Sequence, residues 1–409
     1  MEARQERGLQ IANRCYIGQQ NGFWLVPSQS GNGRYRVDTS KQNPICNCPD
    51  YETRGTPCKH VYAVQYIIEF RRAANGNVEV MQETLQVSET VRPTYPQNWP
   101  AYNAAQTNEK AQFQSLLFDL CSGIQDPPQH MGRPRLPLSD AVFAATFKIY
   151  STFSGRRFIS DLCDAKTKGF IKRVPHYNSI FNALENPELT PILTNLITES
   201  ALPLKAVETS FAADSTGFMT SRFVRWFDQK YGVLRQKHSW VKAHIMCGVK
   251  TNVVTAVEIH EAYTNDAAVL PALATKTAED FNMKEVLADR GYIGAKNLET
   301  ILSLNAVPYI PFKANATGEY GRGKSATWEK MFHYFSFNRE QFFQHYHKRS
   351  NVESTVMMIK TKFRDHVRSK TDTAMKNEVL GKILCHNICC IISAIHELGI
   401  EPVFWSTKN

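Results

Sequence analysis

The chain has 409 residues, of which 43% are hydrophobic and 21% are charged. These fractions are typical of globular proteins and exclude a wholly disordered chain, and the length predicts two or three domains. The formal net charge is +10 at pH 7, which favours an anionic partner, nucleic acid above all. The positive charge is concentrated in residues 131–174, 222–250 and 342–370. Solvated faces would explain any one of these segments, whereas three together favour a phosphate backbone.

The N-terminus and the cysteines indicate the cellular compartment. The first ten residues, MEARQERGLQ, are charged and lack the apolar core of a secretion signal. The most hydrophobic stretch, residues 383–395, is interrupted by His386 and Asn387 and is shorter than the ~20 residues that a membrane span needs. Ten unevenly spaced cysteines do not resemble a disulfide framework. We therefore expect a cytoplasmic protein with no membrane partner.

A cluster of cysteine and histidine near the N-terminus predicts a zinc site. Cys46 and Cys48 are followed after nine residues by Cys58 and His60, with a turn expected between the pairs and a helix from Pro57. Zinc takes four such sulfur and nitrogen ligands in a tetrahedron. Four unrelated side chains, two of them buried thiols, are the alternative. The stretch CNCPDYETRGTPCKHVYAV resembles the SWIM zinc finger, which implies zinc-dependent binding of DNA or protein.

Two proline-marked breaks, at 91–107 and 125–137, predict a linker region over residues 91–137, and neither break can be a long helix or a central strand. The small Cys/His unit before it covers residues 1–90. After it, amphipathic segments at 139–150, 154–165 and 175–184 predict a helical region over 138–203. This region is a candidate DNA-binding region because of its basic residues Arg156, Arg157, Lys166 and Lys168. Packing against the next domain, with solvated basic residues, is the alternative.

The pattern of residues 204–409 predicts an α/β domain. Strands are expected at 206–214, 240–249, 253–260, 285–288 and 307–311, and helices at 266–281, 295–304 and 346–363. The order β-β-β-α-β-α-β-α describes a mixed sheet with helices packed against it. Asp214 and Asp289 each close a predicted strand, where catalytic carboxylates are often found, although a helix cap is the commoner role for such an aspartate.

A third acid lies on the last of these helices. Tyr346, Arg349, Glu353 and Lys360 fall within an arc of about 60° on one face of an ideal helix. A solvated ladder of ion pairs, with Arg349 four residues before Glu353, would explain part of this pattern. Such a ladder would not account for Tyr346 or for the acids at two strand ends.

The spacing Y-x2-R-x3-E-x6-K, preceded by DSTG and ADRGY, resembles the DDE transposases of bacterial insertion sequences that carry the YREK signature. The resemblance implies an RNase H-like catalytic domain in which Asp214, Asp289 and Glu353 form the catalytic triad. It also implies that Tyr346, Arg349 and Lys360 contact the DNA end. Two Mg²⁺ or Mn²⁺ ions, held by the three acids, would activate the nucleophile and neutralise the phosphate.

Two features depart from that family. Only 64 positions separate Asp289 from Glu353, which is too few for the large β-rich insertion of some relatives. Trp328 and the loop 321–324 are candidates for part of its role in holding a flipped base, although packing and solvent exposure explain them more simply. The zinc finger is the second departure, since it is not a usual part of the group.

The sequence therefore predicts a DNA transposase that cuts at terminal repeats and joins the freed 3′-hydroxyl to target DNA. Double-stranded DNA is the expected partner, a homodimer the expected synaptic state, and the bacterial nucleoid the expected location. Two alternatives stay open. One is a transposase-derived DNA-binding or regulatory protein that does not cut, and the other is a nuclease of the same fold without strand transfer.

Overall fold

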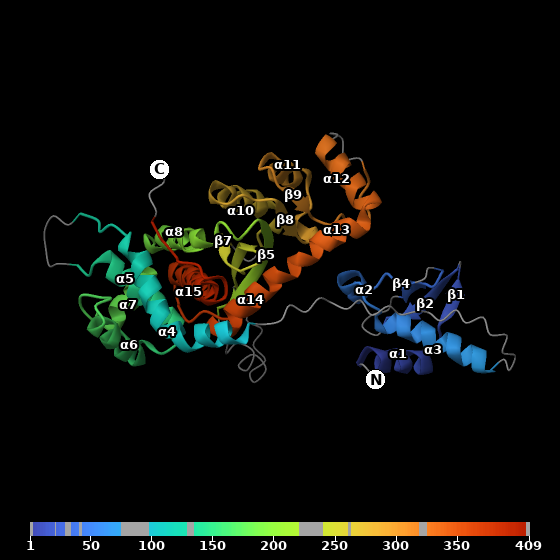
Figure 1. Ribbon diagram of the computed structural model, residues 1–409, viewed down its shortest axis with the longest axis horizontal. Coiled ribbons are helices and arrows are strands. Elements are labelled where there is room, and N and C mark those ends of the chain that lie inside the picture. Colours follow the sequence, from blue (N-terminus) through green and yellow to red (C-terminus); the bar gives the residue numbers. More distant parts are fainter. Residues whose placement is uncertain are drawn as a thin grey trace. The chain divides into compact units, whose positions relative to one another are not determined.

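The computed structural model describes residues 3–20, 22–28, 34–40, 43–74, 98–128, 135–220, 240–260, 263–318 and 325–405. The chain divides into two compact units, Met1–Pro96 and Gln97–Asn409 (Figure 1). Most of the basic segment 222–250 and all of the loop 321–324 lie outside the described residues.

The smaller unit has a four-stranded antiparallel sheet in the order β1-β2-β3-β4 together with helices. Its elements are α1 (Ala3–Arg14), β1 (Gly18–Gln20), β2 (Phe23–Pro27), β3 (Arg34–Asp38), β4 (Ile45–Cys46), α2 (Pro49–Arg54) and α3 (Lys59–Ala74). The expected turn between the Cys/His pairs is in fact the short helix α2. Pro49 fits its first turn, and Gly55 ends it with φ of 63°, a left-handed conformation that favours glycine.

The larger unit begins with five helices: α4 (Trp99–Ser122), α5 (Leu138–Ser151), α6 (Gly155–Thr167), α7 (Tyr177–Glu185) and α8 (Leu189–Ala201). Helices α5, α6 and α7 confirm the three predicted segments. The expectation that no long helix begins before residue 107 is wrong, because α4 starts at Trp99. Pro100 lies in its first turn, where a backbone N–H has no partner within the helix, and the Asn98 side chain caps the helix by accepting from the Ala101 N–H.

A five-stranded mixed sheet forms the centre of the larger unit, in the order β7-β6-β5-β8-β9. Its strands are β5 (Ser210–Met219), β6 (Trp240–Gly248), β7 (Val254–His260), β8 (Glu285–Ala288) and β9 (Val307–Tyr309). β5, β6 and β7 pair antiparallel, whereas β8 and β9 continue the sheet parallel to β5. With α10 (Asp266–Asp280) and α11 (Ala295–Ser303) as the crossovers, this is the RNase H-like arrangement that the sequence predicted.

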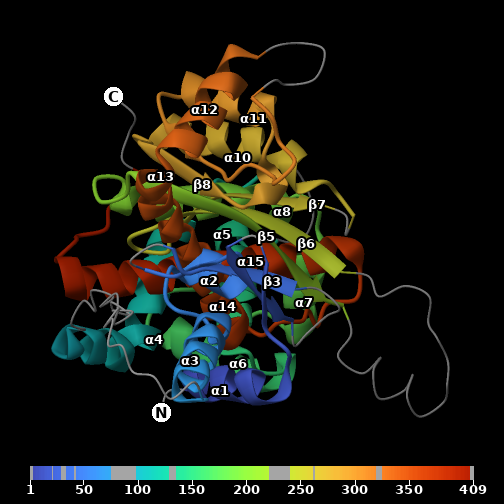
Figure 2. The ribbon, with the colours of Figure 1, turned by 90° about the vertical axis from the view of Figure 1, so that its right-hand side faces the viewer.

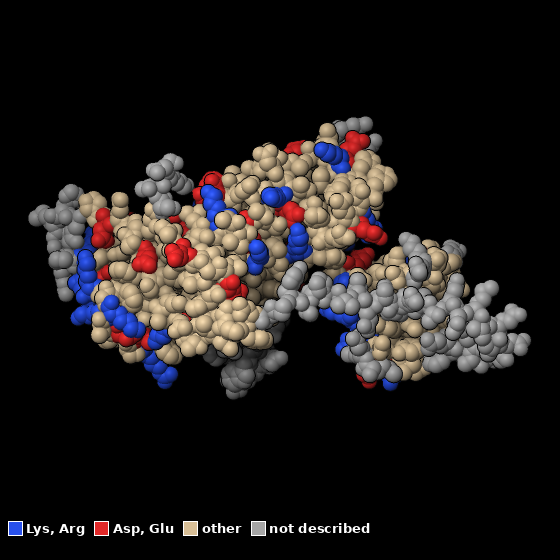
Figure 3. Space-filling view, viewed as in Figure 1, with Lys and Arg blue, Asp and Glu red and all other residues tan. Residues whose placement is uncertain are grey.

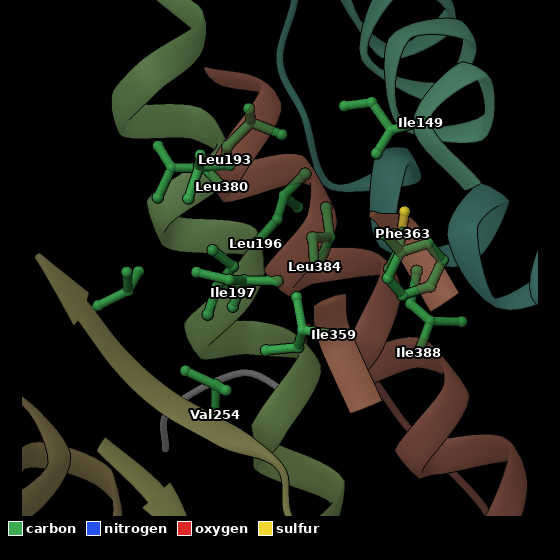
Figure 4. Packing of buried hydrophobic residues seen from close by; sticks show 14 of the residues in the cluster. Ile149, Leu193, Leu196, Ile197, Val254, Ile359, Phe363, Leu380, Leu384 and Ile388 are labelled. Carbon is green, nitrogen blue, oxygen red and sulfur yellow. The ribbon is translucent and has the colours of Figure 1, made fainter. Parts of the chain in front are cut away.

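Helices cover both faces of this sheet, as Figure 2 shows. On one face lie α10, α11 and α12 (Ala326–Phe337), and on the other lie α8, α14 (Ser350–Phe363) and α15 (Asp372–Leu398). Figure 4 shows side chains of α8, such as Leu193 and Ile197, interleaved with Leu380 and Leu384 of α15. One apolar cluster therefore joins the helices before the sheet to the sheet itself.

The long helix α15 runs through this core. Thr371 caps its start by accepting from the Ala374 N–H, and Gly399 ends it with φ of 67°. By its length and mean hydropathy α15 could cross a membrane, but 72% of its most apolar stretch is buried inside the protein. Such burial is typical of a core helix. Its polar Asn387 is buried as well, and it donates to the carbonyls of Ile197 and Val254 and accepts from the Val254 N–H.

Candidate active site and zinc site

The sheet register brings the first two predicted acids together. Ala213 of β5 pairs with Ala288, the last residue of β8, in the parallel direction, so Asp214 and Asp289, which follow this pair, lie side by side. The prediction that Asp214 closes its strand is wrong, since β5 continues to Met219 by pairing with the longer β6. The strand that ends near Asp214 is β8, the parallel neighbour of β5. Beyond the carboxylate, β8 therefore no longer pairs with this edge of β5.

A tight turn fixes the Asp289 carboxylate. Asp289 caps the 3₁₀ turn Arg290–Tyr292, in which its Oδ1 accepts from the Gly291 N–H at 2.7 Å. A Cβ at position 291 would lie only 2.8 Å from this oxygen, so the close approach requires glycine. The helix-cap role that the sequence left open is therefore present. The other oxygen of this carboxylate, Oδ2, does not take part in the cap.

Arg349 connects the other two acids. Its Nη1 lies 3.4 Å from Asp214 Oδ2, and its Nη2 donates to Glu353 Oε1. A ladder along the helix accounts for the contact with Glu353, four residues on, but not for the contact with Asp214 on the sheet. The Arg349 side chain is 17% exposed, whereas that of Glu353 is 59% exposed. One buried guanidinium is thus shared by two carboxylates from different elements.

Burial raises the pKa of Asp214, and the charges of Asp289 and Glu353 raise it further, whereas the Ser215 N–H and Arg349 oppose the rise. The Ser215 N–H donates to Asp214 Oδ1 at 2.8 Å. Asp214 is therefore ionised at a cost, chiefly because it is buried and to a smaller extent because of the other two acids. A site of this kind gains from a bound cation, and Arg349 supplies one positive charge where two of the acids meet.

The helix that carries Arg349 and Glu353 is not continuous. The predicted helix 346–363 consists of the end of α13 (Arg339–Tyr346), a 3₁₀ turn at His347–Arg349 and α14 (Ser350–Phe363). Glu285, at the start of β8, holds this junction to the sheet. Its carboxylate bonds to His345 Nδ1 at 2.6 Å, to Lys348 Nζ at 2.8 Å and to Ser210 Oγ at 2.9 Å. The helical period can be read from the sequence, but the clamp, meaning the bonds from Glu285 to these residues far away in the chain, cannot.

Tyr346 and Lys360 lie at different positions along the segment formed by α13 and α14. Burial raises the pKa of Tyr346, and the nearby Arg349 opposes that rise. Lys360 Nζ lies 5.6 Å from the centroid of the Phe218 ring, and burial lowers the pKa of its amine. Among the described residues, no carboxylate lies within ion-pair distance of Lys360. Tyr346 therefore belongs to the group around Arg349, whereas Lys360 lies about two turns beyond Glu353 on α14.

Sequence reasoning missed a polar group on the opposite face of β5. Ser215 Oγ donates to Asp266 Oδ2 at 3.2 Å, and Asp266 also pairs with Lys242 Nζ at 2.5 Å. The fully buried His244 lies beside them, and burial lowers its pKa to about 4, so that its ring is neutral at pH 7. Because Ser215 bonds to Asp214 through its backbone and to Asp266 through its side chain, it connects this group to the acids. The alternation of side chains along β5 was the available signal.

The four basic residues predicted to bind DNA lie on or just after α6, and all are exposed. Figure 3 shows Lys and Arg side chains over this helix, at the lower left. Arg156 donates to the Tyr177 hydroxyl at 3.3 Å, and Lys168 pairs with Asp164 at 2.8 Å. Trp328 is 7% exposed, packs against Phe312 and donates to the Thr317 carbonyl at 3.0 Å, which supports the packing explanation for this residue.

The four candidate zinc ligands come from four places in the smaller unit. Cys46 ends β4, Cys48 precedes α2, Cys58 precedes α3, and His60 lies in the first turn of α3. All four are buried, and their ligand atoms lie within 4.8 Å of one another. His60 Nδ1 lies 3.9 Å from Cys46 Sγ and 3.7 Å from Cys58 Sγ, and its buried Nε2 has no hydrogen-bond partner among the described residues.

The cysteine and histidine donor set fits the metal that its motif implies, and it is the one group of such donors whose ligand atoms converge among the described residues. Three thiol sulfurs and one imidazole nitrogen converge in the smaller unit, which is a tetrahedral set of the kind that zinc prefers. Neighbouring thiols also raise the pKa of Cys46 far above its usual range, because the crowded sulfurs cannot all ionise without a cation. In the larger unit the donors are carboxylate oxygens, which suit Mg²⁺ or Mn²⁺, and Arg349 is a cation already placed between two of them.

Two protein families match parts of the chain. Residues 205–388 match the transposase DDE domain family, and residues 39–66 match the SWIM zinc finger family. No curated protein sequence matches the chain significantly. A cryo-EM structure of a piggyBac transposase synaptic complex with hairpin DNA is similar at 10% sequence identity and a TM-score of 0.33, over 74% of this chain and 76% of that chain. Residues 205–388 therefore belong to the transposase DDE domain family, and the chain carries this domain after a SWIM zinc finger.

Proposed function

We propose that this protein is a DNA transposase that cleaves phosphodiester bonds at the ends of a mobile element and joins the freed 3′-hydroxyl to target DNA. The observation that carries the proposal is the convergence of Asp214 and Glu353 on Arg349, with Asp289 beside Asp214, inside the matched DDE domain. A protein that only binds DNA has no use for three carboxylates that repel one another next to a phosphate.

Asp214, Asp289 and Glu353 would together hold two Mg²⁺ or Mn²⁺ ions. When bound, such ions lower the pKa of the attacking water or hydroxyl and neutralise charge on the phosphate and on the leaving oxygen. The parts of the chain that orient these carboxylates are the Gly291 N–H, the Ser215 N–H and the Glu285 clamp. They act before any substrate binds, which reduces the reorganisation that the reaction requires.

Arg349 would exchange its partners when DNA binds. Its guanidinium forms bonds to Asp214 and Glu353, and the planar fork of an arginine suits the oxygens of a phosphate equally well. A scissile phosphate that reaches the acids would draw this cation away from them and leave the carboxylate oxygens for the metal ions. Tyr346 packs beside Arg349 and would border the same phosphate, and Lys360 would contact the strand further along α14.

The remaining parts of the chain would bring DNA to this site. Cys46, Cys48, Cys58 and His60 would hold one structural zinc ion, which would order the smaller unit for contact with DNA or protein. Arg156, Arg157, Lys166 and Lys168 would bind phosphates of the terminal repeat along α6. Joining two element ends calls for two active sites, so a homodimer on DNA at the bacterial nucleoid is the proposed working state.

One experiment separates this function from its alternatives. The full chain is incubated with Mg²⁺ and DNA that carries the native terminal repeats, and both 3′-end cleavage and joined products are measured. A transposase gives both products, a nuclease gives cleavage alone, and a regulatory protein gives neither although it binds the repeats.

Two acid variants give the residue-level test. Glu353→Gln should abolish both products and leave repeat binding within about twofold of wild type, because it removes a metal ligand without changing the fold. Glu340→Gln is the matched control, since Glu340 is an exposed acid on the neighbouring helix α13. Cleavage by Glu353→Gln at the wild-type rate would contradict the catalytic assignment.

A further inference from the structure

A second site is suggested by a cavity of about 400 Å³ among α5, α6, α7 and the junction between α14 and α15. Its volume lies in the range of small-ligand pockets. The apolar part of its lining includes Ile149 and Phe363, both labelled in Figure 4, and Phe181 of α7. The charged part comprises five cationic side chains and two carboxylates: Lys148, Arg364, Arg368, Lys370, Lys382, Glu185 and Glu378.

The two carboxylates only partly balance the five cations, and Glu378 is bonded to the backbone as well. Its oxygens accept from the Arg368 N–H at 2.9 Å and from the Ser369 N–H at 2.8 Å. Lys382 lies 3.5 Å away and also donates to the Arg364 carbonyl at 3.3 Å and the His366 carbonyl at 2.6 Å. Glu378 and Lys382 therefore hold the loop between α14 and α15 in place, and the cations of the lining remain in excess over its carboxylates.

The remaining cations have no acidic partner. Among the described residues, no carboxylate lies within ion-pair distance of Lys148, Arg364, Arg368 or Lys370. The two arginines are held in place by neutral acceptors instead. Arg364 Nη2 donates to the Thr152 carbonyl at 3.3 Å, and Arg368 Nη1 donates to the same carbonyl at 3.2 Å. Their positive charge is thus fixed at the cavity without being neutralised.

Lys148 is the most unusual member of this group. It is only 8% exposed, it lines the cavity, and its amine makes no hydrogen bond or ion pair in the described part of the chain. Burial, together with the neighbouring charge of Arg368, lowers the pKa of Lys148 to about 8, although the charge of Glu378 opposes this fall. A buried amine without a partner reduces stability unless an anion compensates it.

The geometry points to this cavity as a binding site for a phosphate group, carried either by a DNA strand or by a free nucleotide. Fixed guanidinium groups together with a buried amine are complementary to phosphate oxygens, and the apolar wall suits the attached sugar or base. Both sources offer the same chemistry. DNA is the favoured one, because Phe363 follows Glu353 by ten residues on α14, which places the cavity ~15 Å from the acids along that helix.

The test is chemical labelling of the full-length protein with pyridoxal 5′-phosphate followed by borohydride, with the modified lysines mapped by mass spectrometry. The aldehyde forms an imine with an amine and releases water, and borohydride reduces the imine to a stable amine. We expect Lys148 to be labelled at least about tenfold faster by pyridoxal 5′-phosphate than by pyridoxal, which has the same aldehyde but no phosphate. Lys376, an exposed amine on α15 outside the cavity, is the internal control and should show no such preference.

Competition identifies the source of the phosphate. One arm adds a duplex DNA of about 40 base pairs and the other adds deoxyadenosine monophosphate. Protection of Lys148 by the duplex at the lower phosphate concentration assigns the site to DNA, and the reverse order assigns it to a nucleotide. Equal labelling by the two aldehydes, or no protection by either competitor, would overturn the proposal. Because cleavage is not measured, the outcome is independent of the proposed transposase activity.

Two variants test the affinity of the protein for the protecting competitor. Lys148→Met keeps the length of the side chain and removes its charge, and it should weaken binding of the protecting competitor about tenfold or more. Lys376→Met removes an exposed charge from the same helix bundle and should leave that affinity within about twofold. Should Lys148→Met fail to fold, the labelling of the unmodified protein still decides the question. Equal affinities for the two folded variants would count against the site.

Discussion

The turn after β8 offers a sharp test of how the protein positions the Asp289 carboxylate. An alanine Cβ at position 291 would lie 2.8 Å from Asp289 Oδ1, whereas ordinary contacts begin at 3.4 Å. The carboxylate would therefore have to move by about 0.6 Å, the difference between these distances. Moving it weakens the 2.7 Å bond from the Gly291 N–H, a charge-assisted hydrogen bond of a kind that contributes about 1.5–3 kcal/mol.

In the proposed mechanism the reaction depends on the position of this carboxylate, so a small displacement is expected to have a large effect. A misplacement of about 1 Å can cost about 100-fold in rate, and we therefore expect Gly291→Ala to slow cleavage by about 10- to 100-fold. The assay is 3′-end cleavage of terminal-repeat DNA with Mg²⁺, together with measured repeat binding, which should stay near wild type. The backbone at Gly291 is not in the left-handed region, so alanine is expected to cause no conformational strain of its own.

Gly294 provides the control from the same loop. A Cβ at this position would meet nothing within 4 Å, and its φ of −178° is extended backbone that any residue adopts. Gly294→Ala should therefore cleave at nearly the wild-type rate. Wild-type cleavage by Gly291→Ala would refute the argument that close packing holds Asp289 in place. Equal losses in both variants would show instead that the loop requires glycine for its backbone.

Three further predictions concern other parts of the molecule. Chelation of zinc, or Cys58→Ser, should abolish the calorimetric transition of the smaller unit and leave that of the larger unit in place, whereas one unchanged transition would contradict the zinc assignment. Arg157→Gln should reduce the salt dependence of DNA binding by about 0.9 in logarithmic slope. Lys168→Gln should have a smaller effect, because Asp164 already pairs with this amine, so the reverse order would count against α6 as a DNA-binding surface. Asp214→Asn should abolish cleavage yet raise the Tm at neutral pH, because burial raises the pKa of Asp214 and makes its ionised form costly to fold. The gain in Tm should disappear in acid, where the carboxyl group is protonated in both the folded and the unfolded states, and a constant gain would contradict this cause.

The local sequence pattern was sufficient to predict much of the secondary structure of the larger unit. The bounds of β6, β7 and β8 agree with the expected strands to within a residue, because each is a short apolar run between turn residues. The mixed sheet and the order of its elements followed from these segments. The prediction failed where a proline was taken as a break, since Pro100 lies in the first turn of α4 rather than before it.

Contacts between distant residues were beyond the sequence pattern. Arg349 meets Asp214 across 135 positions, and no period or spacing in the chain encodes that approach. The same holds for the clamp that joins Glu285 to His345. Helical spacing placed Arg349 and Glu353 on one face, but the parallel register of β5 and β8 decides which acids lie next to them. The identities of the candidate residues were therefore predictable, and the arrangement that connects them was not.

The course of α15 has a consequence for how this protein can evolve. Asn387 bonds to α8 and to β7 at once, and the apolar cluster around it extends from α4 to α14. Residues 138–203 contribute many side chains to this core, so a recombination that replaced them would require new partners on α15. The smaller unit, with its own core, can be inherited or lost as a whole.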